Sequence, residues 1–269
     1  MILATRYVDL RHIKKSNGGH ETARRDLSGC VGMRAQTRCV VGILLAVTIA
    51  SVGPARLAVA GNILFLGNSI TRHGPDPSLQ WAGDWGMAAS RADLDFVSLT
   101  LGQVRQATHS AISGSVVSAS HLEQEFYQLT PSRVRALLAG IRQPVMIVVQ
   151  LGDNVDLSGD RASGMEFARQ YGVLLAGLRE RFGTAARLAC IGKWWPAPSI
   201  DFEIQMECSR AGGSYVDLAD VYSQPWSNAS SERAVTVAQV GAHPGDRAMR
   251  EIANRVAAAL IHPQLPEPR

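Results

Sequence analysis

Three short stretches of this chain combine residue types that together can transfer an acyl group. In the first, Ser69 follows the turn Gly67-Asn68 at the end of an apolar run. A serine at a strand-to-helix turn is exposed and lies close to free backbone N–H groups, which suits a nucleophile with an oxyanion donor beside it. Taken alone, the same serine could simply cap a helix.

The other two stretches supply an asparagine and a histidine. Asn154 closes the turn Gly152-Asp153-Asn154 and could direct its side-chain amide at an oxyanion, although Gly and Asn also suit a turn for backbone reasons alone. His243 precedes Pro244, which makes a rigid junction before a helix, so the imidazole would point in one direction. A serine nucleophile, an oxyanion donor and an oriented histidine are the parts of a serine hydrolase.

The surrounding sequence predicts an α/β protein that would hold these residues together. Alternating strands and helices indicate a parallel sheet covered by helices on both faces, with functional residues at the carboxyl ends of the strands. The predicted strands are Asn62–Leu66, Asp95–Leu101, Val145–Leu151, Arg187–Ile191 and Tyr215–Leu218. The predicted helices span 117–127, 131–141, 163–182, 201–211 and 245–261.

In this order, the three stretches resemble the sequence blocks of the SGNH/GDSL hydrolases, a family named after its serine, glycine, asparagine and histidine. The resemblance covers almost all of residues 61–260 and implies a three-layer flavodoxin-like fold, with about five parallel strands and helices on both faces. It also implies ester hydrolysis without a metal or other cofactor. The matching blocks are Gly67-Asn68-Ser69-Ile70, with Asn68 in place of the commoner Asp, then Gly152-Asp153-Asn154 and His243-Pro244.

The resemblance implies a two-step mechanism with an acyl-enzyme intermediate. His243 would take the proton of Ser69 as this serine attacks an ester carbonyl, and water would then release the acyl group. The oxyanion would be bound by the N–H of Ser69, an N–H from the second block and the amide of Asn154.

Two positions depart from the family pattern. The acid expected three residues before His243 is replaced by Val240, which cannot orient an imidazole. Either a main-chain carbonyl holds the ring, giving a Ser69–His243 dyad, or an acid arrives from elsewhere. The candidate acids are Asp153, Glu232 and Asp246.

The second departure concerns the glycine of the second block, which has no clean motif here. We favour Gly114, in Ser113-Gly114-Ser115, over Gly102, which follows the predicted second strand. A residue near Ser118–Ser120 could supply the N–H instead.

Tryptophans near the predicted strand ends bear on the substrate. Trp81 and Trp85 follow the nucleophile, and Trp195 follows the fourth strand, so all three could stack on sugars, although each could equally be a packing residue. We therefore expect a short-chain carbohydrate esterase. The alternatives are a lysophospholipase- or thioesterase-type hydrolase of small esters, and a catalytically decayed glycan-binding module.

The charge of the chain is concentrated at its N-terminus. The net charge is +4, but residues 1–60 carry +6 and residues 61–269 carry −2, so the support for a nucleic-acid partner disappears. Residues 33–60 read as a signal peptide, with cleavage near Ala60-Gly61, and an uncleaved anchor as the alternative. Residues 1–32 read as a leader, either an over-extended start or disordered. We expect a periplasmic or secreted domain over 61–269, without stable membrane insertion.

The spacing of the four cysteines argues against a structural zinc site, because no two of them form a CxxC pair. Only Cys190 and Cys208 lie after residue 60, on a predicted strand and the following helix. Export would allow them to form a disulfide, and the sequence leaves that question open.

Overall fold

The computed structural model describes residues 61–155 and 161–263. The predicted leader (1–32), the predicted signal peptide (33–60) and the cleavage site after residue 60 lie outside the described residues. The described residues all belong to one compact unit, Pro54–Arg269.

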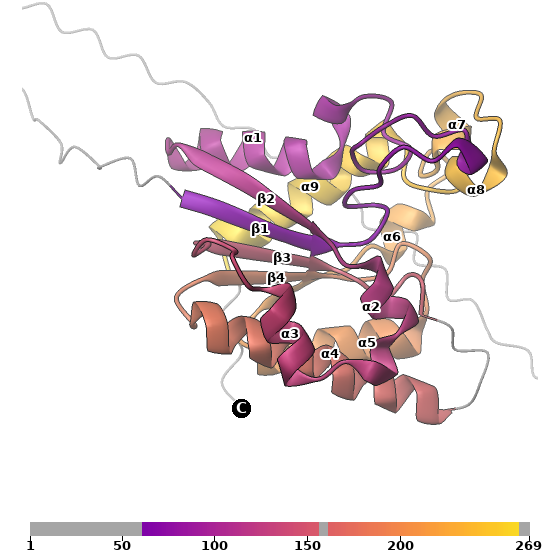
Figure 1. The fold of residues 1–269 in the computed structure, drawn as a ribbon. Helices are drawn as coiled ribbons and strands as arrows, with labels where there is room; N and C mark the ends of the chain where they lie inside the picture. The colour runs from indigo at the N-terminus through magenta and orange to yellow at the C-terminus, as the bar shows by residue number, and fades with distance from the viewer. Residues whose placement is uncertain (1–60, 156–160, 264–269) are drawn as a thin grey trace, which may run out of the picture. The chain divides into compact units, whose positions relative to one another are not determined.

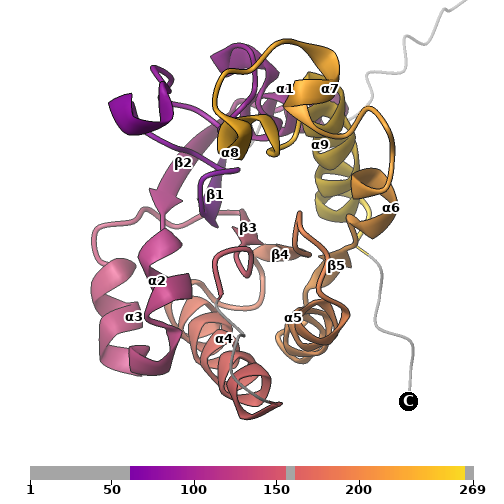
Figure 2. The ribbon, with the colours of Figure 1, turned by 90° about the vertical axis from the view of Figure 1, so that its right-hand side faces the viewer.

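A five-stranded sheet, parallel throughout, forms the centre of this unit, in the order β2-β1-β3-β4-β5 (Figures 1 and 2). This order is that of the flavodoxin-like, doubly wound sheet. The predicted fold class is therefore confirmed. The strands are β1 (Gly61–Gly67), β2 (Ile112–Ser118), β3 (Met146–Gln150), β4 (Arg187–Ile191) and β5 (Ser214–Val216).

Helices cover both faces of the sheet, and β1 supplies side chains to both layers. Ile63 and Phe65 lie in the core under α1 (Phe96–Thr108) and α9 (Asp246–Ile261), whereas Leu64 and Leu66 lie in the core on the opposite face. Figure 1 shows α1 and α9 on one side of the sheet, and α3, α4 and α5 on the other. The helices of the second layer are α3 (Pro131–Leu137), α4 (Arg161–Phe182) and α5 (Pro198–Arg210).

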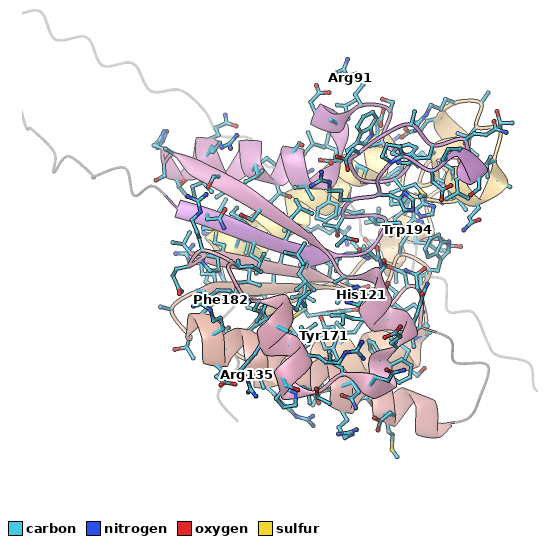
Figure 3. All side chains as sticks on the ribbon, viewed as in Figure 1. Arg91, His121, Arg135, Tyr171, Phe182 and Trp194 are labelled. Carbon is cyan, nitrogen blue, oxygen red and sulfur yellow. A yellow bond between two sulfur atoms is a disulfide. The ribbon has the colours of Figure 1, made fainter. Side chains whose placement is uncertain are left out.

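Figure 3 shows the same two-layer arrangement in side chains, with Tyr171 and Phe182 on the α4 side of the sheet and Trp194 near the strand ends. Tyr171 and Phe182 are both buried in the core of that layer. Short helices complete the loops at the strand ends: α2 (Ser120–Gln124), α6 (Ala219–Tyr222), α7 (Ala229–Glu232) and α8 (Ala238–Gly241). Single 3-10 turns lie at Pro77–Leu79, Ala92–Leu94 and Phe126–Gln128.

The register of the sheet brings three strand ends level. Gly67, at the end of β1, lies opposite Ser118 of β2 on one side and Gln150 of β3 on the other. Because the strands are parallel, the turns that follow β1, β2 and β3 meet at one edge of the sheet. This edge carries the candidate site.

The predicted second strand, Asp95–Leu101, is wrong: these residues begin α1. Asp95 is the N-cap of α1, and its carboxylate accepts the N–H of Ser98 at 2.7 Å. The buried positions of α1, among them Phe96, Thr100 and Val104, follow a helical spacing. The second strand is instead β2, an edge strand rich in serine and partly exposed, so it lacks the apolar run that marks a buried strand. The predicted helix 117–127 consequently begins too early, since β2 extends to Ser118.

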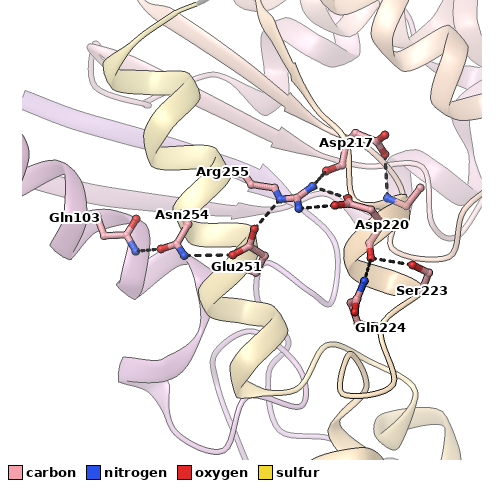
Figure 4. Close-up of polar contacts among 9 residues, drawn as sticks. Gln103, Asp217, Asp220, Ser223, Gln224, Glu251, Asn254 and Arg255 are labelled. Atoms are coloured by element: carbon pink, nitrogen blue, oxygen red, sulfur yellow. Dashed lines mark hydrogen bonds and ion pairs between the residues drawn. The ribbon is translucent and has the colours of Figure 1, made fainter. Parts of the chain in front are cut away.

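Polar contacts fix α9, the helix that begins three residues after His243. Arg255 of α9 makes a bidentate ion pair with Asp220 of α6, at 2.6 and 2.8 Å, and a bond to Glu251 at 3.0 Å (Figure 4). Asn254 accepts a hydrogen bond from Gln103 of α1 at 2.7 Å. These contacts join α9 to both α6 and α1.

A disulfide links β4 to α5. Cys190 and Cys208 are bonded at 2.12 Å and both are buried, which answers the question that the sequence left open. The bridge links α5 covalently to β4, on the face of the sheet that α3, α4 and α5 cover.

Candidate active site

The turn after β1 presents Ser69. A side chain at Gly67 would come within 2.9 Å of the Gln150 carbonyl oxygen, so only glycine fits between the strands here. Asn68 closes the turn, because its Oδ1 accepts the N–H of Ile70 at 3.0 Å. Ser69 is therefore held at the rim of the sheet, partly exposed, while Asn68 is fully buried.

Ser69 and His243 form a hydrogen-bonded pair although 174 positions separate them in the chain. Ser69 Oγ lies 3.0 Å from His243 Nε2, and His243 Nδ1 lies 2.9 Å from the main-chain oxygen of Gln239 in α8. A carbonyl oxygen only accepts, so Nδ1 carries the hydrogen and Nε2 presents its lone pair to the serine hydroxyl. Of the two ways to hold the ring that the sequence left open, the structure has the main-chain carbonyl.

The three acids considered from the sequence are bonded elsewhere. Asp153 accepts the N–H of Trp194 at 2.7 Å. Glu232 accepts the first two N–H groups of α9, at 2.6 and 2.8 Å, which places a carboxylate where the helix dipole favours it. Asp246 accepts the hydroxyl of Ser90 at 2.6 Å. Among the described residues, none of these three carboxylates is hydrogen-bonded to His243.

Val240, at the position where the sequence resemblance implies an acid, has a packing role. It is buried in a small apolar cluster with Met87, Ala88 and Ala229. An acid at this position would lose its hydration in that cluster, so the carbonyl of Gln239 is the acceptor that this loop can offer.

Burial sets the basicity of His243. The residue is only 4% exposed, and its ring packs edge-on against Trp195, with ring centroids 5.0 Å apart. Because burial disfavours the imidazolium form, the pKa of His243 is lowered from 6.5 to about 4, although the bond to Gln239 opposes this shift. At neutral pH the ring is therefore neutral and able to accept a proton.

A cavity of about 470 Å³ opens over this pair. Ser69, Asn154 and His243 all line it, so the structure brings these three predicted residues together. The other polar residues that line it are Arg72, His73, Asp84, Ser118, Ser120, Gln124 and Gln239, and the apolar ones are Leu79, Met87, Val116 and Trp195.

Gly114, the favoured oxyanion donor of the second block, is not brought to the site. It lies opposite Ile63 in the middle of β2, four residues before the strand ends, and it does not line the cavity. Gly102 lies in α1. Ser118, at the end of β2, and Ser120, at the start of α2, do line the cavity, so the alternative donor near these residues stays a prediction.

Of the three predicted substrate-binding tryptophans, only Trp195 lines the cavity. Trp81 and Trp85 pack edge-on against each other, with centroids 5.5 Å apart. Their indole N–H groups donate to the main-chain oxygens of His73 and Ala89, at 3.0 and 2.9 Å. Both therefore pack within the loop after Ser69 and, unlike Trp195, do not line the cavity.

A buried acid beside the site, Glu123 of α2, could not be predicted from the sequence. Asn68 Nδ2 donates to Glu123 Oε1 at 3.0 Å and to Asp153 Oδ2 at 3.1 Å. Burial raises the pKa of both carboxyl groups above their ordinary values. Nothing in the spacing of a lone glutamate within a short helix marks it as part of a site, so pattern analysis could not find it.

The part of the chain that the structure describes comprises residues 61–155 and 161–263. In them, no three His, Cys, Asp or Glu side chains gather closely enough to bind a metal ion. No helix in these ranges combines the length and the apolar content required to cross a bilayer.

Comparisons with known proteins return solved structures only. No family model and no curated protein matches the chain. A psychrotrophic esterase, EstA, from Pseudoalteromonas sp. has a TM-score of 0.48 and 16% identity, covering 75% of this chain and 96% of that one. A protein described as a GDSL-like lipase from Bacteroides uniformis has a TM-score of 0.48, 15% identity and the same coverage. A family two carbohydrate esterase from Cellvibrio japonicus has a TM-score of 0.45 and 17% identity, covering 75% of this chain and 61% of that one. At these identities and TM-scores, the likeness does not establish a shared activity.

Proposed function

We propose that this chain is a serine esterase of the SGNH/GDSL type that works with a Ser69–His243 dyad. The observation that carries the proposal is the pair itself: Ser69 Oγ is 3.0 Å from an Nε2 whose lone pair faces it. A nucleophile and base within hydrogen-bond reach, with the base oriented by a third group, are the signature of nucleophilic catalysis. Here the third group is the Gln239 carbonyl.

In the first step, Ser69 Oγ bonds to the ester carbonyl carbon while its proton moves to His243 Nε2. The protonated ring then gives this proton to the leaving alcohol as the ester C–O bond breaks. In the second step, water attacks the acyl-enzyme and loses a proton to the same Nε2, which returns it to Ser69 as the acid leaves. The Ser69 N–H, an N–H at the start of α2 and the Asn154 amide are the proposed oxyanion donors.

The cavity favours a small acyl group on a polar alcohol. Ten of the residues that line it are polar and four are apolar, so it offers little apolar surface to a long alkyl chain. Trp195 offers an aromatic surface beside His243, and aromatic rings suit the apolar faces of sugars. We therefore propose short-chain, acetyl-like esters, with acylated carbohydrates as the substrate class.

Export of the mature domain is part of the same proposal. A disulfide within the catalytic unit fits an oxidising compartment such as the periplasm or the exterior of the cell. The signal-like sequence of residues 33–60 points the same way.

A substrate panel tests this function. Residues 61–269 are incubated with p-nitrophenyl esters from acetate to octanoate, and with acetylated xylan, in wild-type and Ser69→Ala form. We expect turnover to be fastest with acetate and to fall with chain length, acetate to be released from the glycan, and the variant to be inactive. Equal turnover in folded Ser69→Ala would contradict the assignment, and a preference for octanoate would contradict the short-chain specificity.

A further inference from the structure

Glu123 is the buried acid that the proposed mechanism does not use. It belongs to α2, is 1% exposed, and its carboxylate accepts hydrogen bonds from two separate strand-end turns. A buried carboxylate is costly unless it is well bonded, so the identity of its donors indicates what it holds in place.

Most of these donors belong to the turn after β3. Glu123 Oε1 accepts the N–H of Gly152 at 2.5 Å and that of Asn154 at 3.4 Å. Gly152 has a φ of +133°, a conformation that side chains rarely adopt. One carboxylate oxygen therefore stabilises the tight turn that ends at Asn154.

The second oxygen fixes the Asn154 side chain. Glu123 Oε2 accepts Asn154 Nδ2 at 2.6 Å. The NH₂ side of the Asn154 amide, and not its oxygen, therefore faces Glu123. This bond occupies one of the two Nδ2 hydrogens and orients the other, on a side chain that lines the cavity with Ser69.

The same carboxylate also reaches the turn that carries the nucleophile. Asn68 Nδ2 donates to Glu123 Oε1 at 3.0 Å, and Asn68 directly precedes Ser69. Glu123 thus joins the nucleophile turn after β1 to the oxyanion turn after β3.

We propose that Glu123 is a positioning residue that holds Asn154 Nδ2 in place as an oxyanion donor. This role rests on the proposed esterase function, because it has meaning only if an oxyanion forms at Ser69. Glu123 touches no substrate and acts through Asn154. Catalysis by such donors depends on their being oriented before the charge develops, so a displaced amide should cost rate and not substrate binding.

The test compares two changes at Glu123 with one matched control. Glu123→Gln keeps the length but replaces an acceptor by an NH₂ group, and Glu123→Asp keeps the charge but shortens the reach to Asn154. Glu125→Gln is the control, because Glu125 is paired with Arg133 at 2.9 Å, outside the cavity. With p-nitrophenyl acetate, we expect both Glu123 variants to lose about 10²-fold in kcat, with KM changed by less than about twofold. The control should match wild type.

A double-mutant cycle separates positioning from a general effect on the fold. Asn154→Ala alone should lower kcat, and Glu123→Gln in that background should lower it no further, because the group it holds is gone. Additive losses, an effect confined to KM, or wild-type kcat in folded Glu123 variants would each overturn the proposal. Unfolding of both Glu123 variants, seen by thermal denaturation, would assign the residue to stability and would also overturn it.

These experiments distinguish a failure of the Glu123 proposal from a failure of the proposed esterase function. If wild-type protein does not hydrolyse the ester, or if Ser69→Ala is as active as wild type, the function itself is wrong. If wild type is active, Ser69→Ala is inactive and the Glu123 variants behave as wild type, only the role of Glu123 is wrong.

Discussion

At the scale of single residues, the pairing of His243 with a carbonyl distinguishes this site from a triad. The neutral Gln239 oxygen orients the ring as an aspartate would, but it gives the imidazolium less stabilisation than a carboxylate does. Burial outweighs this bond, so the histidine resists protonation although the Gln239 oxygen favours it. His243 is therefore a weak base, but its ring stays neutral and can accept a proton at mildly acidic pH.

This leads to a prediction for pH dependence. General-base catalysis needs the neutral ring, so kcat/KM should hold from neutral pH downward and fall as the pH passes through about 4, instead of near 6.5. An NMR titration of the His243 ring alongside the rate profile tests this, because it separates the histidine from the acids beneath it. A ring that titrates near 6.5 would contradict the burial argument.

The lowered pKa of His243 also determines how the free energy of unfolding changes with pH. The unfolded chain binds a proton at an ordinary histidine pKa, whereas the folded chain does not until about pH 4. The unfolded state therefore holds more protons between these values, and His243 lowers the free energy of unfolding as the pH falls through this window.

The contacts of Asn68 explain why an amide suits this position better than a carboxylate. Its oxygen accepts the N–H of Ile70, and its NH₂ group donates to both Glu123 and Asp153. A carboxylate at position 68 would face two buried acids and lose both donated bonds. The sequence revealed the substitution, but its reason became visible only with Glu123 and Asp153 in place.

Which residues gather at the cavity could be predicted where they follow a strand end, but not where their placement depends on packing. Ser69, Asn154 and His243 follow turns, so sequence order and strand ends were enough to bring them together. Trp81 and Trp85 carry the same residue type as Trp195, but whether an indole packs or lines a cavity depends on tertiary contacts.

At the scale of elements, β2 explains most of what the sequence could not predict. Strands β1, β3 and β4 are buried apolar runs and were identified within one or two residues. Strand β2 lies at the sheet edge, where serine and glycine replace apolar residues, so its pattern resembled a loop. With the strand predicted at 95–101, its end falls at Gly102, whereas β2 ends at Ser118.

The disulfide between β4 and α5 gives a prediction at this scale. Cys190 and Cys208 close a segment of 18 positions, and a loop of this size is expected to contribute about 3 kcal/mol to the free energy of unfolding. Alkylation of denatured, unreduced protein followed by peptide mapping should leave both cysteines unlabelled, and a Cys190→Ala/Cys208→Ala variant should unfold at lower urea concentration. Full labelling of both cysteines in unreduced protein would show that the bridge does not form.

At the scale of the whole molecule, the topology makes the site possible. The strand order 2-1-3-4-5 puts β1 and β3 side by side, so the turns after them meet at one edge of the sheet, and the loop before α9 brings His243 to the turn after β1. Ser69, from the first strand end, and His243, from the loop before the last helix, become neighbours only through this arrangement. The slightly acidic balance of residues 61–269 gives no reason to expect a nucleic-acid partner.

The central claim is that His243 makes Ser69 a nucleophile, and a covalent probe tests it most directly. The protein is treated with a fluorophosphonate, which transfers its phosphonyl group to an activated serine as fluoride leaves, and the modified peptide is identified by mass spectrometry. We predict labelling at Ser69 in wild type, none in Ser69→Ala, and a strong loss in folded His243→Ala. Labelling at another serine, or undiminished labelling of Ser69 without His243, would contradict the account.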